Sequence, residues 1–299
     1  MMSYHEAVLL TESVDLLDIQ AEGIYVDATF GGGGHSREIL SRLQGGRLIA
    51  FDKDPDARHN VPPDERFTLI SEDFKFIESE LEKAGVEKVD GILADLGISS
   101  HQIDTPQRGF SFRFDAPLDM RMNPGQGPTA AELLNEWDEQ ELARVFAQYG
   151  EVPNSRKLAR TIVQARAGQR LSGSAQLESV IQDCIPKNRR SKYLAQVYQA
   201  LRIVVNAELE ALEQLLLASL RLLRPGGRMV VIAYHSLEDR MVKRFFRAGN
   251  LSGKVEKDFY GHDLTPWRLI TRRAIQASQE EIARNPRARS ARLRAAERR

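Results

Sequence analysis

A run of four glycines between two differently patterned segments constrains this chain more than any other feature. The apolar β-formers of residues 25–30 lead into Gly31–Gly34, and a helical pattern follows over residues 36–43. Glycines allow a tight turn and let the backbone approach a ligand with no Cβ in the way. The free N–H groups at the start of a helix point to the same place. This is the pattern of the strand, turn and helix in a nucleotide-binding βαβ unit.

The next predicted strand ends in an acid. Residues 47–52 are mostly apolar and finish at Asp52. An acid about 20 residues beyond the glycines can accept hydrogen bonds from ribose hydroxyls. The spacing therefore predicts a ligand that contains adenosine.

Strands and helices alternate through most of the chain, which favours a parallel, doubly wound α/β sheet with helices on both faces. Further strands are predicted over residues 67–70, 89–96, 228–234 and 267–272, and residues 224–227 are predicted to form a sharp turn. Residues 129–206 show helical patterns without any strand signal. The predicted domains are therefore residues 1–104 with 207–299, and an inserted helical domain over residues 105–206.

Polar residues follow the predicted strands where each of them ends. In an open parallel sheet the ligand lies outside these carboxyl ends. The polar ends are the 31–35 loop, Asp52, Asp73–Phe74, Asp95–Ser100 and Tyr234–Ser236. Asp95 follows a buried strand, where a carboxylate costs desolvation unless it has a partner. We therefore expect Asp95 to accept hydrogen bonds from a ligand or a turn.

Charge is balanced over the whole chain but clustered locally. Lys and Arg total 42, as do Asp and Glu, so no global field attracts nucleic acid. The segment Lys187–Lys192 is basic, and residues 284–299 carry seven arginines against one glutamate. Together with Arg108 and Arg113 beside aromatic residues, these clusters favour a phosphate-rich partner.

Composition also limits the cofactors and the compartment. The six histidines and the single Cys184 show no metal-ligand spacing, so no metal site is predicted. No apolar stretch is long enough to span a bilayer, and residues 1–6 lack a basic signal-peptide region. We expect a cytoplasmic protein.

Two other functions fit parts of this pattern. The glycines and Asp52 are compatible with an NAD-dependent oxidoreductase, although no hydride-transfer acid is evident. The protein could also be an RNA-binding assembly factor that does not use its nucleotide ligand for chemistry.

Several segments taken together resemble the bacterial 16S rRNA cytosine-N(4)-methyltransferase family. The similar motifs are Asp27–Ser36, Asp95–Ser100, Arg108–Phe112, Leu118–Met122, Gln199–Ile203, Tyr234–Arg240 and the C-terminal segment 286–298. The chain departs from the family pattern at residues 152–153 and 193–196, both inside the expected insertion.

The resemblance implies a Rossmann-like class I methyltransferase sheet that binds S-adenosylmethionine. The expected activity is methylation of the exocyclic N(4) amine of a cytosine in the decoding region of 16S rRNA. The expected partner is small-subunit ribosomal RNA or the assembled small subunit, and the oligomeric state stays open, a homodimer included. The implied cofactor contacts are Gly33, Gly34, His35, Asp52, Phe74, Asp95 and Gln102. The residues expected to position the amine or flank the base are Asp95, Ser99, Tyr234 and His235.

Overall fold

The computed structural model describes residues 7–299 and divides the chain into two compact units. One unit contains the chain up to Gly97 together with Leu209–Arg299, and the other is Ile98–Glu208. The residues on which the signal-peptide expectation rests lie outside the described range. Within that range, no helix has both the length and the apolar character that crossing a membrane requires.

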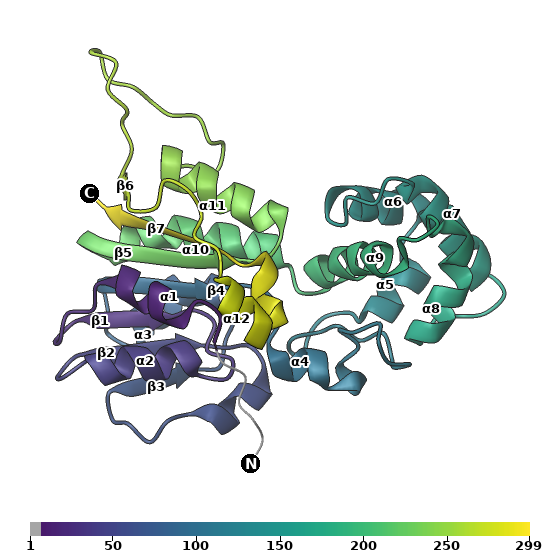
Figure 1. Ribbon diagram of the computed structural model, residues 1–299, viewed down its shortest axis with the longest axis horizontal. Helices are drawn as coiled ribbons and strands as arrows, with labels where there is room; N and C mark the ends of the chain where they lie inside the picture. Colours follow the sequence, from purple (N-terminus) through teal and green to yellow (C-terminus); the bar gives the residue numbers. More distant parts are fainter. Residues whose placement is uncertain (1–6) are drawn as a thin grey trace. The chain divides into compact units, whose positions relative to one another are not determined.

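A seven-stranded sheet forms the centre of the first unit, in the order β3-β2-β1-β4-β5-β7-β6 (Figure 1). Its parallel strands are β1 (Ile24–Asp27), β2 (Arg47–Phe51), β3 (Phe67–Ile70), β4 (Val89–Asp95) and β5 (Leu223–Ala233). Strand β7 (Arg292–Arg298) runs antiparallel between β5 and β6 (Trp267–Leu269). The expected α/β sheet is confirmed, with the carboxyl ends of five parallel strands at one edge.

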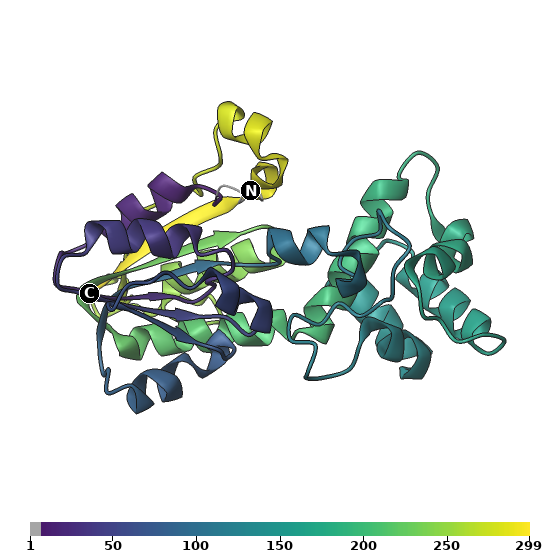
Figure 2. The same cartoon turned by 90° about the horizontal axis from the view of Figure 1, so that it is seen from below.

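Helices cover both faces of this sheet, as Figure 2 shows from another side. Successive side chains of a strand point to opposite faces. Tyr25 and Leu48 therefore pack on one side, under α1 (Leu10–Leu17) and α2 (Gly34–Arg42). Val26 and Ile49 pack on the other side. The helices there are α3 (Ile77–Lys83), α10 (Glu208–Leu222) and α11 (Ser236–Ala248).

The sharp turn expected at residues 224–227 is instead part of β5. Leu223 pairs with Val89 of β4, and the next paired residues are Arg228 and Gly91, so the register shifts between them. Four residues of β5 lie between its two paired positions, while β4 has only one there. Gly226, with φ of 84°, absorbs the irregular backbone.

The arginine-rich C-terminal segment is not a free basic tail. It begins at Arg284, the last residue of α12 (Gln279–Arg284), and continues through the short 3-10 helix η5 (Pro286–Ser290). Its second half is β7, whose residues 293–296 are buried. Leu293 and Ala295 pack under α1, whereas the side chain of Arg294 between them pairs with Asp239 of α11. The segment therefore helps to build the sheet.

Helices make up most of the second unit around one apolar core. They are α4 (Ser100–Asp104), α5 (Ala130–Glu136), α6 (Glu139–Gln148), α7 (Ser155–Arg166), α8 (Ser174–Ile181) and α9 (Arg190–Val205). The remaining short elements of the chain are η1 (Pro55–Asn60), η2 (Phe74–Phe76), η3 (Pro106–Arg108) and η4 (Gln182–Cys184). The unit begins earlier than the expected residue 105, because Ile98 packs against its core.

The irregular segment that follows η3 is held by side chains of the same unit. Arg108 donates to the carbonyls of Arg121 and Met122, at 3.1 and 2.8 Å. Asn206, at the end of α9, donates to the carbonyl of Met120 and accepts from the Met122 N–H. Arg108, expected from sequence to contact phosphate, is therefore engaged with backbone.

Candidate functional site

The glycine-rich turn leaves the start of α2 open to a ligand. Gly33 is the N-cap with φ of 73°, and it offers no side chain to cap the helix. A Cβ on Gly33 would lie 2.9 Å from both Arg37 and Phe30. The glycine is therefore required by backbone conformation and by space together. Without a side-chain cap, the first N–H groups of α2 remain available to a bound group.

Asp27, at the end of β1, ties this turn to the sheet. Its carboxylate accepts from Ser36 Oγ at 2.7 Å and from the Thr29 N–H at 3.1 Å. Burial raises its pKa. The only sign of this role in the sequence is the position of Asp27 as an acid at the end of an apolar strand.

Asp52 faces the same turn from the end of β2. Its Oδ2 accepts the Gly31 N–H at 2.7 Å, and its Oδ1 accepts the Asp54 N–H at 2.8 Å. Burial raises the pKa of Asp52 to about 6. Each carboxylate oxygen can accept a second hydrogen bond. Asp52 can therefore hold the glycine turn and a ligand hydroxyl at the same time.

Phe74 follows the end of β3, where it begins η2. The preceding Asp73 caps this short helix through the Lys75 N–H and pairs with Lys53 at 2.9 Å. Phe74 is half-buried and packs against the core of the first unit. The polar contacts of Asp73 thus fix the backbone from which the Phe74 ring extends.

Asp95 ends β4 and is joined to the end of β5. Tyr234 Oη donates to Asp95 Oδ1 at 2.7 Å, and the Asp95 N–H donates to Thr29 Oγ1. Burial raises the pKa of Asp95 to about 6. The pKa of Tyr234 lies well above 10, because the side chain is buried and Asp95 adjoins it. Tyr234 therefore stays protonated and acts as a donor.

His35, in the first turn of α2, lies beside Asp95. Burial lowers the pKa of His35, which favours the neutral ring. Its Nε2 lies 3.1 Å from the Val8 carbonyl, which can only accept, so Nε2 carries the proton. Its Nδ1 is then an acceptor, 3.9 Å from Asp95 Oδ2. A ligand N–H donor at this place would satisfy both acceptors.

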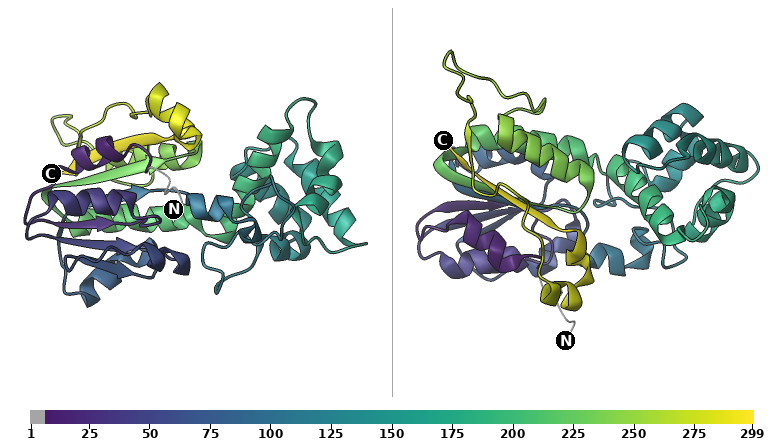
Figure 3. Two further views of the ribbon diagram at one scale, coloured as in Figure 1. Left: turned by 60° about the horizontal axis from the view of Figure 1, so that its bottom comes forward. Right: turned by 45° about the horizontal axis from the view of Figure 1, so that its top comes forward.

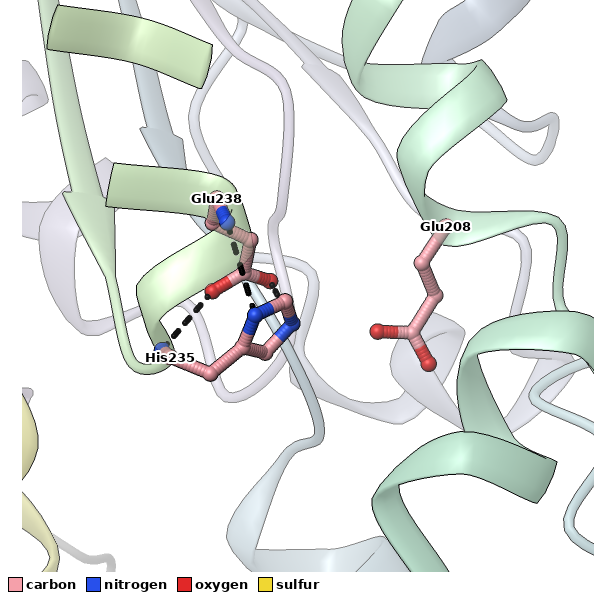
Figure 4. A group of neighbouring side chains, drawn as sticks. All are labelled: Glu208, His235 and Glu238. Carbon is pink, nitrogen blue, oxygen red and sulfur yellow. Dashed lines mark hydrogen bonds and ion pairs between the residues drawn. The ribbon is translucent and has the colours of Figure 1, made fainter. Parts of the chain in front are cut away.

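His235 caps α11, and Glu238 completes a capping box with it (Figure 4). Glu238 accepts the backbone N–H groups of Tyr234 and His235, and its Oε1 lies 3.1 Å from His235 Nε2. Glu238, 2% exposed, was missed from sequence, although His-x-x-Glu at a helix start resembles a capping box. Glu208, drawn in the same figure, begins α10 and pairs with Arg202.

Ser99 and Gln102 belong to the second unit, where they start α4. The Gln102 N–H donates to Ser99 Oγ at 3.2 Å, and the Ser99 N–H donates to Gln102 Oε1 at 3.1 Å. Each residue therefore has a capping role. The first unit gathers the other expected residues, from the glycine turn to Asp52, Asp95 and Tyr234.

Comparisons with known proteins agree with one another along the whole chain. The model of the MraW methylase family matches residues 2–299. A protein of Phocaeicola vulgatus called ribosomal RNA small subunit methyltransferase H is 54% identical, covering 99% of this chain and 98% of its own. A Flavobacterium johnsoniae protein with the same name is also 54% identical, with the same two coverages.

Solved structures with a similar arrangement are more distant. A crystal structure of an rRNA methylase from Streptococcus thermophilus is 13% identical, with a TM-score of 0.41, over 100% of this chain and 99% of that one. A Methanococcus jannaschii fibrillarin pre-rRNA processing protein is 8% identical, with a TM-score of 0.40, over 93% and 67%. Both TM-scores lie below 0.5, so neither likeness bears on the function.

Proposed function

The chain belongs to the MraW methylase family, and we propose that it methylates small-subunit ribosomal RNA in the cytoplasm. The methyl group comes from S-adenosylmethionine and goes to the exocyclic N(4) amine of a cytosine in the decoding region. The observation that carries this proposal is the cluster of His35, Asp95 and Tyr234 at the carboxyl ends of β4 and β5. It supplies acceptors beside a glycine turn that is open to a nucleotide.

The residues of the first unit fit S-adenosylmethionine. Asp52 has acceptor capacity for ribose hydroxyls, and Phe74 offers an aromatic ring for the adenine. Gly33 and Gly34 present the uncapped start of α2, where a Cβ on Gly34 would lie 2.7 Å from Ala7. When bound, the cofactor supplies an electrophilic methyl group on sulfur.

The two acceptors at His35 and Asp95 suit the ammonium group of the same cofactor. His35 Nδ1 and Asp95 Oδ2 both lack a proton when Asp95 is ionised, and they lie 3.9 Å apart. A cation with several N–H donors can bond to both. Gln102 is the last of the proposed cofactor contacts. It lies in the second unit, where it stabilises the start of α4.

The cytosine amine that receives the methyl group is a poor nucleophile, because its lone pair is delocalised into the ring. The protein must therefore activate it. A carboxylate that accepts a hydrogen bond from the amine draws the lone pair towards attack and can take the released proton. Asp95 has the chemistry for this role, and Tyr234 fixes its orientation. Ser99, four residues later, and His235 are proposed to position the base, which must leave its stack to react.

The second unit is proposed to bind the substrate RNA. Its basic run, residues 187–192, is exposed, and Arg190 within it pairs with Glu178. Lys187, Arg189 and Lys192 remain as cations on its surface, where phosphate can bind them. Arg113 is also exposed, unlike Arg108.

Mass spectrometry of small-subunit RNA tests the whole proposal. The purified protein is incubated with S-adenosylmethionine and either naked 16S RNA or small subunits from cells that lack the enzyme. We expect one added methyl group, which nuclease mapping and nucleoside standards assign to N(4) of one cytidine. Binding of RNA and cofactor without methyl transfer would instead identify an assembly factor.

A further inference from the structure

The loop between α11 and β6 carries two aromatic side chains that nothing in the described chain covers. Phe259 is 97% exposed and Tyr260 82% exposed, and their rings lie edge to face with centroids 5.6 Å apart. Figure 3 shows this loop, residues 250–266, extending beyond the helices of the first unit. Large aromatic side chains of soluble proteins are seldom exposed to this degree, so such a pair suggests a binding role.

Hydrogen bonds within the loop hold its tip in place. Asp258 accepts the N–H groups of Tyr260 and His262, and it pairs with the His262 ring at 3.0 Å. Lys257 pairs with Asp263 at 3.6 Å. The two acids are therefore engaged inside the loop, and the aromatic rings project from an anchored turn.

The ends of the loop are closely packed. Gly249 ends α11 with φ of 75°, and a Cβ there would lie 2.2 Å from Pro266. A Cβ on Gly253 would lie 3.2 Å from the Arg244 side chain of α11. The root of the loop therefore packs against the exposed face of this helix.

That exposed face is a basic stripe. Arg240, Lys243, Arg244 and Arg247 recur at helical spacing, and all four are exposed. The opposite face of α11, with Val242, buries itself against the sheet. Among the described residues, Lys243, Arg244 and Arg247 have no ion-pair partner.

Several other arginines of this unit, by contrast, pair with acids. Arg42 pairs with Asp15, and Arg221 pairs with Glu78. Helix α11 begins directly after His235, at the carboxyl end of β5, and spans about 20 Å over its length. The stripe therefore leads from the end of the sheet where the proposed site lies to the aromatic loop.

We propose that the stripe and the aromatic pair form a surface for single-stranded RNA that flanks the methylated nucleotide. Phosphates bind the cations of α11, and bases stack on Phe259 and Tyr260. Single-stranded nucleic acids are bound in this way, by a basic track with aromatic stacking platforms. The proposal rests on RNA being the substrate. The adjacent cations favour RNA, because each nucleotide of a single strand carries a phosphate beside its base.

Serine at both aromatic positions tests the stacking. The variant Phe259→Ser/Tyr260→Ser is compared with Leu264→Ser, which removes an apolar side chain, 54% exposed, from the same loop. Binding of a short fluorescein-labelled oligocytidylate is followed by anisotropy. We expect affinity to fall by about tenfold or more in the aromatic variant. The Leu264→Ser control should bind like the wild type.

Neutralising the stripe tests the phosphate contacts. In Lys243→Gln/Arg244→Gln/Arg247→Gln, the slope of log affinity against log salt should shrink by about 2, since each lost contact with a single strand removes about 0.7. The control is Arg42→Gln/Arg221→Gln/Arg224→Gln, which removes the same charge at ion-paired positions. The control should keep most of the wild-type slope.

The proposal is overturned if the aromatic variant and the stripe variant both bind oligocytidylate as tightly as the wild type. If these variants then also fail to methylate assembled subunits, the loop contacts a ribosomal protein instead of RNA. Titration with S-adenosylhomocysteine should give the same affinity in all variants. A wild-type protein that binds the oligonucleotide but methylates no RNA would contradict the proposed function while leaving this surface in place.

Discussion

Tyr234 Oη donates a 2.7 Å hydrogen bond to Asp95 Oδ1 and so links the ends of β5 and β4. The donor favours the ionised carboxylate and opposes the effect of burial, and the pKa of Asp95 is about 6 with both present. Because the phenol is itself buried, it has no competing role as a base near neutral pH. The hydrogen bond therefore orients the Asp95 carboxylate, which is proposed to act on the amine, and favours its charged form.

Tyr234→Phe should shift the pH dependence of methylation. Loss of the donor removes an interaction that lowers the pKa of Asp95, so this pKa should rise above about 6. The acidic limb of the kcat profile should then move to higher pH. At neutral pH, kcat should fall by roughly five- to tenfold, the value of one ordinary hydrogen bond. An unshifted acidic limb would show that the phenol does not act through Asp95.

Asp95→Asn separates a catalytic role from a binding role. The variant keeps the shape of the side chain and an acceptor for Tyr234, but it loses the charge. If Asp95 acts on the amine, kcat should fall with little change in the KM for RNA. If it acts only on the cofactor, the KM for S-adenosylmethionine should rise, and excess cofactor should restore the rate. We expect both effects, so full activity at saturating cofactor would contradict the catalytic role.

The same variant should change how stability depends on pH. The folded-state pKa of Asp95, about 6, lies above the usual aspartate pKa of 3.8. Between these values the folded protein holds a proton that the unfolded chain has released, so this group's contribution to stability falls as pH rises through that range. Asp95→Asn cannot ionise. Its Tm relative to wild type should therefore be higher at pH 8 than at pH 5, which scanning calorimetry can measure. A difference that is constant with pH would contradict the raised pKa.

Asp52→Ala should weaken cofactor binding. The carboxylate is the proposed acceptor for the ribose hydroxyls, and hydrogen bonds to charged groups contribute about 1.5–3 kcal/mol. Calorimetric titration with S-adenosylhomocysteine should show affinity lower by roughly ten- to a hundredfold. Asp56→Ala, an exposed acid on the following 3-10 helix, is the matched control and should bind normally. Unchanged affinity in a folded Asp52→Ala protein would rule out the ribose role.

Sequence patterns predicted the parallel strands and the acids at their ends, because alternation and strand-end polarity are local signals. They did not predict β7, because the partner of its Arg294 lies far away in the sequence and composition does not reveal it. They also did not show that Arg108 holds the backbone of its own unit, because its acceptors are carbonyls 13 and 14 residues away. The mutual capping of Ser99 and Gln102 follows from their spacing, which is that of a capping box.

The buried ion pair of Arg294 and Asp239 gives the last prediction. Arg294 Nε donates to Asp239 Oδ1 at 2.7 Å, and the two side chains are 10% and 11% exposed. Removing one partner of a buried pair costs up to about 3–5 kcal/mol. Asp239 would keep only Arg292, which is 49% exposed and whose Nη1 lies 3.4 Å from Asp239 Oδ2. Arg294→Met should therefore lower the free energy of unfolding by up to about 3–5 kcal/mol in urea titrations, and it should weaken cofactor binding only through lost folding. The double variant Asp239→Leu/Arg294→Met removes both charges and should regain most of the stability. If the double variant is no more stable than Arg294→Met, then β7 depends on the arginine for packing and not for its charge.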